Sequence, residues 1–288
     1  MGRDRPTGTG VRVPRVPNRI DGARLRGELA APVGPYAQVD VVASTGSTNA
    51  DLRQAVVDGA PDRTALVAAE QTAGVGRRGR TWASPGSGVY VSVLLRPTGV
   101  PIAGVGSLSI IAGLAVLDVG DALGARVALK WPNDVLAADA SGKCAGILSE
   151  AASSDELAVV LGIGLNVTRV RADVATPAGA LSPVSLAELG AATSDRTDVA
   201  MMVLAALHER EVAWREAAGD LVDAGMLDEY RQRCLTLGQE VKIVTGGGNV
   251  VGDAVDVEST GALVVELPGG TRRSVFAGDV VHLRPTDG

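Results

Sequence analysis

The chain contains few aromatic residues and few cysteines, and both scarcities limit what it can be. Tryptophan, tyrosine and phenylalanine together make up 2% of its 288 residues, so valine, leucine, isoleucine and alanine have to form the core. The two cysteines, Cys144 and Cys234, are too few and too distant for a disulfide framework, which favours a reducing compartment. Neither His208 nor His282 has a partner at metal-ligand spacing, so we assign no metal-binding histidine.

The sequence also lacks the patterns expected for membrane insertion and export. No apolar run reaches the roughly 18 residues that a membrane helix needs, and the amino-terminal residues lack the apolar stretch of a signal peptide. The net charge of −6 argues against extensive nucleic-acid binding. We therefore expect a cytoplasmic protein that binds neither a membrane nor DNA.

Composition along the chain predicts three parts. Residues 1–36 hold seven arginines, three acids and at most a short helix near residues 20–30, which predicts a disordered tail. Residues 37–236 mix apolar strands and helices and are predicted to form a catalytic domain. Over 237–288, four short valine-rich segments separated by glycine-rich turns are typical of a small antiparallel barrel.

The apolar pattern of the middle part predicts both helices and strands. The predicted helices cover residues 48–58, 108–123, 198–217 and 221–234. The predicted strands cover residues 38–43, 65–70, 89–95, 127–130, 135–137, a segment starting at 143, and 157–167.

A glycine- and arginine-rich stretch, EQTAGVGRRGRTW at residues 70–82, stands out in the first half of the chain. Glycine lets a backbone approach a ligand closely, and arginine binds carboxylates and phosphates through its planar fork. No acid occurs from residue 71 to residue 117. The glycine spacing also fits a dinucleotide fingerprint, but that motif requires a helix directly afterwards, and the following RTWASPGSG does not favour one. We therefore predict a flexible anion-binding loop.

Other polar clusters interrupt apolar segments. Ser47–Asn49 opens a predicted helix, where helix capping is the simpler explanation and ligand binding the alternative. Residues 130–134, Lys-Trp-Pro-Asn-Asp, contain a turn signal, which does not account for the adjoining lysine and tryptophan. Lys143 begins a strand of small residues, and Asn166 ends an apolar strand, where its amide needs a partner.

In this order, the motifs resemble those of the biotin protein ligase family over roughly residues 39–284. They are found at residues 47–49, 74–82, 130–134, 143–148 and 162–167. Each motif alone is weak, but all five in the right order are strongly specific. The resemblance implies an α+β fold, with a mixed-sheet catalytic domain of the class II aminoacyl-tRNA synthetase type and a small SH3-like β-barrel. It also implies a monofunctional enzyme, without the DNA-binding domain of bifunctional members.

The chemistry that the resemblance implies has two steps. The carboxylate of biotin attacks the α-phosphate of ATP, assisted by Mg²⁺, which gives biotinyl-5′-AMP and pyrophosphate. A lysine on the biotin carboxyl carrier domain of an acyl-CoA carboxylase then attacks this mixed anhydride. A homodimer is a further expectation.

The resemblance also implies roles for individual residues. Lys143 and Arg77 are expected to be catalytic. The expected biotin contacts are Ser47, Thr48, Asn49, Gln71, Gly74, Gly76, Arg77, Lys143 and Gly146. The expected nucleotide contacts are Arg78, Arg80, Trp82, Asn133, Asn166 and Arg284. We assign no metal ligand.

One position departs from the family pattern, and two other functions stay open. Val75 stands where the family loop usually has its first arginine, so either Arg78 or Arg80 compensates or the ligand is held less strongly. A lipoate or octanoate ligase has a similar catalytic fold, but lacks this loop paired with Lys-Trp-Pro-Asn-Asp. A biotin-binding regulator would need a DNA-binding domain, which the sequence does not supply.

Overall fold

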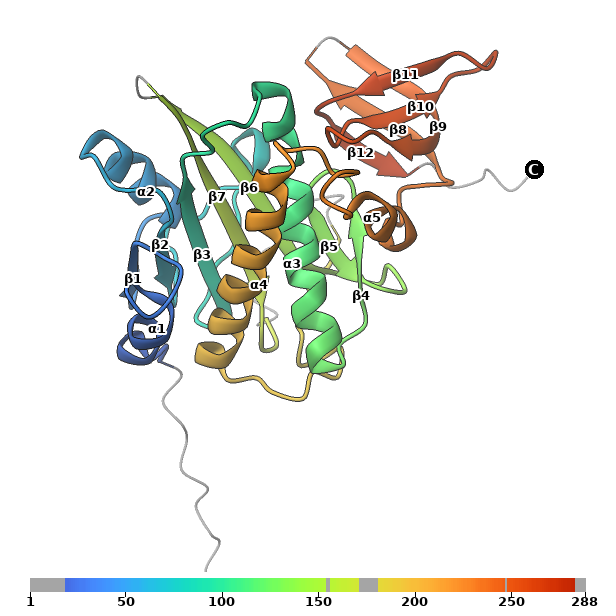
Figure 1. The fold of residues 1–288 in the computed structure, drawn as a ribbon. Helices are drawn as coiled ribbons and strands as arrows, with labels where there is room; N and C mark the ends of the chain where they lie inside the picture. Colours follow the sequence, from blue (N-terminus) through green and yellow to red (C-terminus); the bar gives the residue numbers. More distant parts are fainter. Residues whose placement is uncertain (1–18, 154–155, 171–180, 247, 283–288) are drawn as a thin grey trace, which may run out of the picture.

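The computed structural model describes residues 19–153, 156–170, 181–246 and 248–282, which form two bodies (Figure 1). The larger body is a seven-stranded sheet with helices packed on it. The smaller body is a five-stranded sheet formed by the carboxyl-terminal part of the chain. This architecture confirms the predicted α+β class, a mixed-sheet domain followed by a small antiparallel β domain.

The larger sheet has the strand order β1-β2-β3-β7-β6-β5-β4. Strands β1 and β2 pair in parallel and the other neighbours are antiparallel. The strands are β1 (Gln38–Val42), β2 (Thr64–Ala68), β3 (Gly88–Leu95), β4 (Val127–Lys130), β5 (Asp134–Ala137), β6 (Lys143–Ser153) and β7 (Leu157–Asn166).

The helices all belong to the larger body or to its junction with the smaller one (Figure 1). They are α1 (Gly22–Leu29), α2 (Thr48–Val57), α3 (Leu108–Leu123), α4 (Arg196–Glu216) and α5 (Leu227–Arg233), with short 3₁₀ helices η1 (Arg77–Gly79) and η2 (Ile102–Ser107). Helix α3 ends as predicted at Gly124, which adopts the left-handed conformation that glycine tolerates best. Asp195 caps α4 by accepting from the backbone N–H groups of Thr197 and Asp198.

Strand alternation sends different side chains to the two faces of the larger sheet. On β7, Leu161, Ile163 and Leu165 enter the main core, in which α3 and α4 pack against each other. Gly162 and Gly164 face the opposite side, on which α2 lies with its own small apolar cluster. That second face is therefore left with room above its glycines.

The expected disordered tail is wrong for residues 19–36. Helix α1 is capped by Asp21, and it buries Leu25 and Leu29 in the main core, with Leu25 at 0% exposure. The backbone N–H of Asp21 donates to Thr197 Oγ1 at 3.0 Å, which fixes α1 against the start of α4. The short helix that the sequence allows near residues 20–30 is present, but its few apolar residues among many arginines did not predict that it packs into the core. Residues 1–18 lie outside the described residues.

The expectation that no apolar run reaches membrane-helix length is also wrong. Helices η2 and α3 form a continuous stretch, Ile102–Leu123, of 22 residues that is long and apolar enough to cross a membrane by length and composition. Of its most apolar 18-residue window, 67% is buried inside the protein, as expected for a core helix, so the stretch is weak evidence for a membrane span.

The smaller sheet has the order β11-β10-β9-β8-β12 and is antiparallel throughout. Its strands are β8 (Glu240–Thr245), β9 (Gly248–Val257), β10 (Leu263–Glu266), β11 (Arg272–Val275) and β12 (Asp279–His282). The sequence predicted the first four but not β12. The predicted helix over residues 221–234 also begins too early, because α5 starts at Leu227. The chain turns before that point, where Gly225 has a φ of 69°.

Trp131 lies at the junction of the two bodies and is 1% exposed. Its indole Nε1 donates to the Gly261 carbonyl at 2.9 Å, and its backbone N–H donates to Thr236 Oγ1 at 3.1 Å. Trp131, whose presence beside the turn signal at residues 130–134 had no explanation in the sequence, thus links the end of β4 to the smaller sheet.

Truncating the buried α1 side chain tests whether residues 19–36 belong to the folded domain. We expect Leu25→Ala to lower the free energy of unfolding by about 2–5 kcal/mol, because it leaves a cavity in the core. The matched control is Val33→Ala, whose side chain is 77% exposed and which should change stability by less than about 0.5 kcal/mol. Urea denaturation of the full chain measures both changes. Equal small effects of the two substitutions would contradict the packing of residues 19–36 in the folded domain.

Candidate functional site

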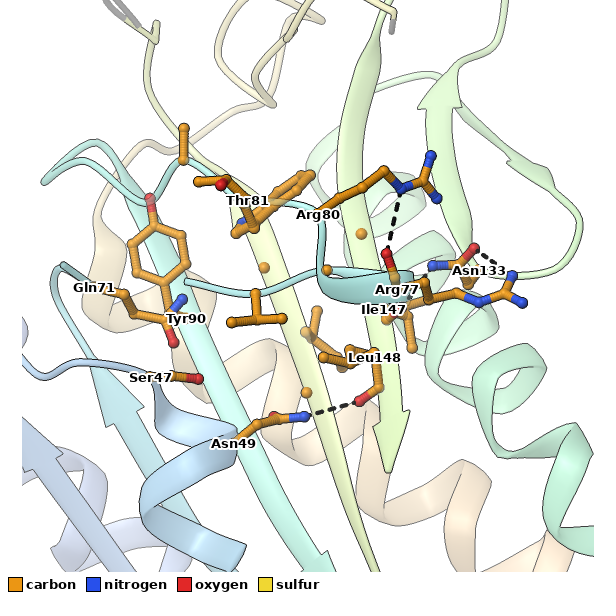
Figure 2. A pocket seen from close by; sticks show the side chains of 18 of the residues that line it. Ser47, Asn49, Gln71, Arg77, Arg80, Thr81, Tyr90, Asn133, Ile147 and Leu148 are labelled. Carbon is orange, nitrogen blue, oxygen red and sulfur yellow. Dashed lines mark hydrogen bonds between the residues drawn. The ribbon is translucent and has the colours of Figure 1, made fainter. Parts of the chain in front are cut away.

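A cavity of about 310 Å³ opens on the glycine face of the larger sheet (Figure 2). Its walls come from the start of α2, from the loop at residues 71–83 and from strands β3, β6 and β7. A Cβ at Gly162 would collide with the Asn49 amide, and a Cβ at Gly164 would collide with the Trp82 indole. The glycines therefore form a floor on which other groups lie directly against the backbone.

One end of the cavity carries neutral polar groups. Gln71 Oε1 accepts from the backbone N–H of Thr48 at 2.8 Å and from Thr48 Oγ1 at 3.0 Å. Gln71 Nε2 donates to Ser84 Oγ at 2.9 Å. Ser47 is the N-cap of α2, so the capping explanation is correct for this serine, which also lines the cavity.

Trp82 lies on the glycine floor, with Lys143 on its ring. Lys143 Nζ is 5.0 Å from the ring centroid, within cation–π range. A Cβ at Gly146 would come 3.1 Å from the six-membered ring of the same indole. The Trp82 Nε1 atom is buried and has no hydrogen-bond partner among the described residues. This indole is thus held by packing and charge, with an unused donor.

The arginines of the loop at residues 71–83 contact the smaller sheet. Arg77 donates to the Gly278 carbonyl at 3.1 Å and to Asn133 Oδ1 at 3.3 Å. Arg80 pairs with Asp279 at 2.9 Å and Arg78 pairs with the same carboxylate at 3.4 Å. The sequence shows no acid near these arginines, but the fold brings one from β12. The predicted anion-binding loop therefore has an internal counter-ion.

The cationic end of the cavity contains more positive than negative groups. Lys143 pairs with Asp134 at 2.6 Å. Burial lowers the pKa of Lys130, which lies within electrostatic range of Asp134, Lys143 and Arg80. Burial likewise lowers the pKa of the Arg77 guanidinium, and the nearby carboxylates oppose that shift. Around this end, five basic side chains lie near the two carboxylates Asp134 and Asp279, and three of them, Arg77, Arg80 and Lys143, line the cavity. This arrangement favours an anionic ligand.

Most of the predicted site residues line this one cavity. They are Ser47, Thr48, Asn49, Gln71, Gly76, Arg77, Arg80, Trp82, Asn133, Lys143, Gly146 and Asn166. Val75, the position that departs from the family pattern, also lines it.

Two of the predicted residues do not line the cavity, and a third cannot be placed relative to it. Gly74 packs against the Trp82 carbonyl and Ser84, where a side chain would clash. Arg78 points to Asp279 and its side chain is 53% exposed. Arg284 lies outside the described residues. The assignments of these residues to a ligand stay predictions.

The two asparagines predicted to contact the nucleotide use amide N–H groups within the protein. Asn133 Nδ2 donates to the Ile147 carbonyl at 2.7 Å. Asn166 Nδ2 donates to the carbonyls of Lys143 and Val184 at 3.2 and 3.1 Å, so the partner that its sequence position requires is backbone. Asn133 Oδ1 also accepts from Arg77, so each Oδ1 atom keeps at least one lone pair for a ligand or its metal.

Three residues that line the cavity were not predicted as site residues: Tyr90, Gly162 and Gly164. The glycines did carry a signal, because glycines two residues apart in a buried strand mark a close approach to the backbone. Tyr90 carried none, since an aromatic residue in an apolar strand is ordinary core composition.

Comparisons with known proteins agree with this geometry. Residues 41–166 match the biotin/lipoate A/B protein ligase family, and residues 236–283 match the biotin protein ligase C-terminal domain. A biotin–[acetyl-CoA-carboxylase] ligase of Mycobacterium tuberculosis is 44% identical over 272 residues, which cover 92% of this chain and 96% of the relative. The chain belongs to the biotin protein ligase family.

Two further comparisons extend the family relationship. A biotin–[acetyl-CoA-carboxylase] ligase of Paracoccus denitrificans is 34% identical over 246 residues, or 83% of this chain and 98% of the relative. Among solved structures, the biotin protein ligase of Aquifex aeolicus in complex with biotin and ATP has a TM-score of 0.68 and 26% identity. That match covers 86% of this chain and all of the other one.

The contact between the loop and Asp279 can be tested in this biotin ligase family member by proteolysis. We expect Asp279→Asn to speed tryptic cleavage after Arg78 and Arg80 by about two- to fivefold, because exposed ion pairs contribute up to about 1 kcal/mol. The control is Asp253→Asn, an exposed carboxylate on β9 of the same sheet. Equal cleavage rates in the wild type and the Asp279 variant would show that the loop is held by other contacts.

Proposed function

We propose that this chain is an ATP-dependent biotin–[biotin carboxyl-carrier protein] ligase. The observation that carries the proposal is the polarity of the cavity, which has neutral hydrogen-bonding groups at one end and cations at the other. Figure 2 shows Ser47, Asn49 and Gln71 on one side and Arg77, Arg80 and Asn133 on the other. Biotin combines a neutral cyclic urea with an apolar chain and a carboxylate, and ATP adds phosphates at the carboxylate end.

Formation of the adenylate is the first step. Ser47, Thr48 and Gln71 hold the ring, while the glycine floor leaves space for the apolar chain. Lys143 and Arg77 face the carboxylate as it attacks the α-phosphate, and they stabilise the negative charge that gathers on the oxygens. The bond between the α- and β-phosphates breaks, and pyrophosphate leaves. Arg80 and Arg78, together with Asn133, Asn166 and Trp82, are proposed nucleotide contacts.

Mg²⁺ fits this site as a companion of ATP. In the described part of the chain no three His, Cys, Asp or Glu side chains are grouped to hold a metal. Mg²⁺ commonly takes one or two protein oxygens and substrate phosphates, and Asn133 Oδ1 and Asp134 are candidate oxygens at the cationic end. When bound, the ion would neutralise part of the triphosphate charge. The protein side chains bind and orient the two substrates around it.

Transfer to the carrier domain is the second step. The lysine amine of the acceptor attacks the acyl carbon of biotinyl-5′-AMP, forms an amide bond and releases AMP. The acceptor proposed here is the biotin carboxyl carrier domain of an acyl-CoA carboxylase. The relatives are named after acetyl-CoA carboxylase, which supports this choice. We further propose that α1 extends the predicted catalytic domain of residues 37–236 back to residue 19. A cytoplasmic location, a homodimer and the absence of DNA binding stay predictions of the same proposal.

A transfer assay tests the proposed function directly. We expect the full chain to attach labelled biotin to a carrier domain only when ATP is present, and to attach no labelled lipoate or octanoate. The control acceptor is the same carrier domain with its target lysine changed to arginine. Transfer of lipoate or octanoate instead of biotin would favour the alternative ligase. Tight biotin binding without transfer would favour a regulator.

Removing the Lys143 charge tests its catalytic role. A unit charge about 4 Å from a developing anion interacts by about 4 kcal/mol at an effective dielectric constant near 20. If half of that acts only in the transition state, Lys143→Met slows pyrophosphate release by about 30-fold. The matched control is Lys242→Met on β8, which lies outside the cavity and should keep the wild-type rate. A Lys143 variant within twofold of wild type would exclude this role.

A further inference from the structure

Behind the neutral end of the cavity lie two polar residues that do not line it, one of them fully buried. Ser92, in the middle of β3, is 0% exposed and is the one polar side chain in the strand GVYVSVLL apart from the Tyr90 hydroxyl. Glu150 reaches the same place from β6. Strand alternation puts both on the glycine face of the sheet, directly behind the start of α2. Thr48 and Asn49, 3% and 5% exposed, connect this group to the cavity.

The orientation of the Asn49 amide is fixed by its partners. Its Nδ2 donates to the Leu148 carbonyl at 3.2 Å and to Glu150 Oε2 at 2.8 Å. A backbone carbonyl and a carboxylate can only accept, so the amide nitrogen has to face them. Arg53 pairs with the other oxygen of Glu150 at 2.9 Å, in a partly exposed ion pair. The Asn49 Oδ1 atom is therefore directed toward Ser92.

This orientation determines where the hydroxyl hydrogen of Ser92 points. Ser92 Oγ lies 2.6 Å from Asn49 Oδ1, and an amide oxygen can only accept, so Ser92 donates to it. Ser92 has a single hydrogen. Toward its other neighbour, Thr48 Oγ1 at 2.7 Å, it can therefore act only as an acceptor.

Thr48 then has two acceptors and one hydrogen. Its Oγ1 lies 2.7 Å from Ser92 Oγ and 3.0 Å from Gln71 Oε1. Gln71 keeps its oxygen on this side because its Nε2 donates to Ser84 at 2.9 Å. The hydrogen of Thr48 thus stays within the protein in either case. Toward the cavity, the Thr48 hydroxyl presents only lone pairs.

We propose that Ser92, Asn49 and Glu150 are positioning residues that fix Thr48 as a hydrogen-bond acceptor toward the cavity. The inference rests on the proposed function, in which the ligand is biotin. A ligand atom that meets Thr48 has to be a donor, and the cyclic urea of biotin offers N–H groups, whereas the dithiolane of lipoate offers none. Asn49 acts here through Thr48 rather than by direct contact, because each of its polar atoms already has a protein partner.

A double-mutant cycle on the full chain tests whether Ser92 acts through Thr48. Biotin binding is measured by titration calorimetry for Thr48→Val, Ser92→Ala and the double variant. We expect each single change to raise the Kd about tenfold, the effect of losing one buried hydrogen bond. The Kd of the double variant should be no more than about twofold above that of the weaker-binding single variant, because the effects of coupled residues do not add. A double variant weakened about 100-fold would mean that Ser92 supports only the fold.

A second pair keeps the test decisive if Ser92→Ala does not fold. Glu150→Ala, at a partly exposed position, should raise the biotin Kd about threefold in the wild-type background, since Leu148 still orients the amide. The same change should have no effect in the Thr48→Val background, and an unchanged threefold effect there would contradict the proposal. Arg53→Gln is the control that removes the ion pair and keeps the Asn49 bond, so its Kd should equal that of the wild type.

The same measurements separate this inference from the function on which it rests. A wild-type chain that binds no biotin would contradict the proposed function. If the wild type binds biotin and the effects of the single variants on the Kd add up in the double variant, only the positioning network would be contradicted.

Discussion

The buried indole of Trp131 is the contact that places the small sheet against the catalytic domain. Its Nε1 bond to Gly261 and the bond from its backbone to Thr236 join the end of β4 to both sides of the junction. Leaving a buried donor without a partner costs about 1–3 kcal/mol. The junction therefore requires these two hydrogen bonds as well as the apolar packing of the indole. With the sheet held there, Gly278 and Asp279 reach the arginines above the cavity. The cationic end of the site thus depends on a residue that does not line it.

The two sides of the site differ in how firmly they are held. The floor consists of glycines in the paired strands β6 and β7, and the neutral end consists of buried hydrogen bonds with committed donors. The arginines above are 53% and 59% exposed at Arg78 and Arg80, and exposed ion pairs are weak. In the proposed function, the rigid surface would recognise the uncharged part of the ligand, and the exchangeable ion pairs would receive its charged part.

Local pattern was enough to predict much of the fold and the cavity. Helix α3 and its end at Gly124, strand β4 and the position of Ser47 at a helix start follow from periodicity and capping, which depend on neighbouring residues. What failed depends on tertiary contacts. The few apolar residues of α1 matter only because α4 covers them, and the pairing of Asp279 with Arg80 joins residues 199 positions apart. The hydrogen-bond chain through Ser92 likewise crosses three elements.

The pairing of Arg78 with Asp279 spans 201 positions, and this separation has a consequence during synthesis. A ribosome that adds roughly 5–20 residues per second needs roughly 10–40 s to make the intervening chain. In that interval the loop is present while its counter-ion and the strand that carries it do not yet exist. A growing polypeptide therefore lacks the contact between the loop and the small sheet. That contact can form only once the strand that carries Asp279 has been made and has paired with β8.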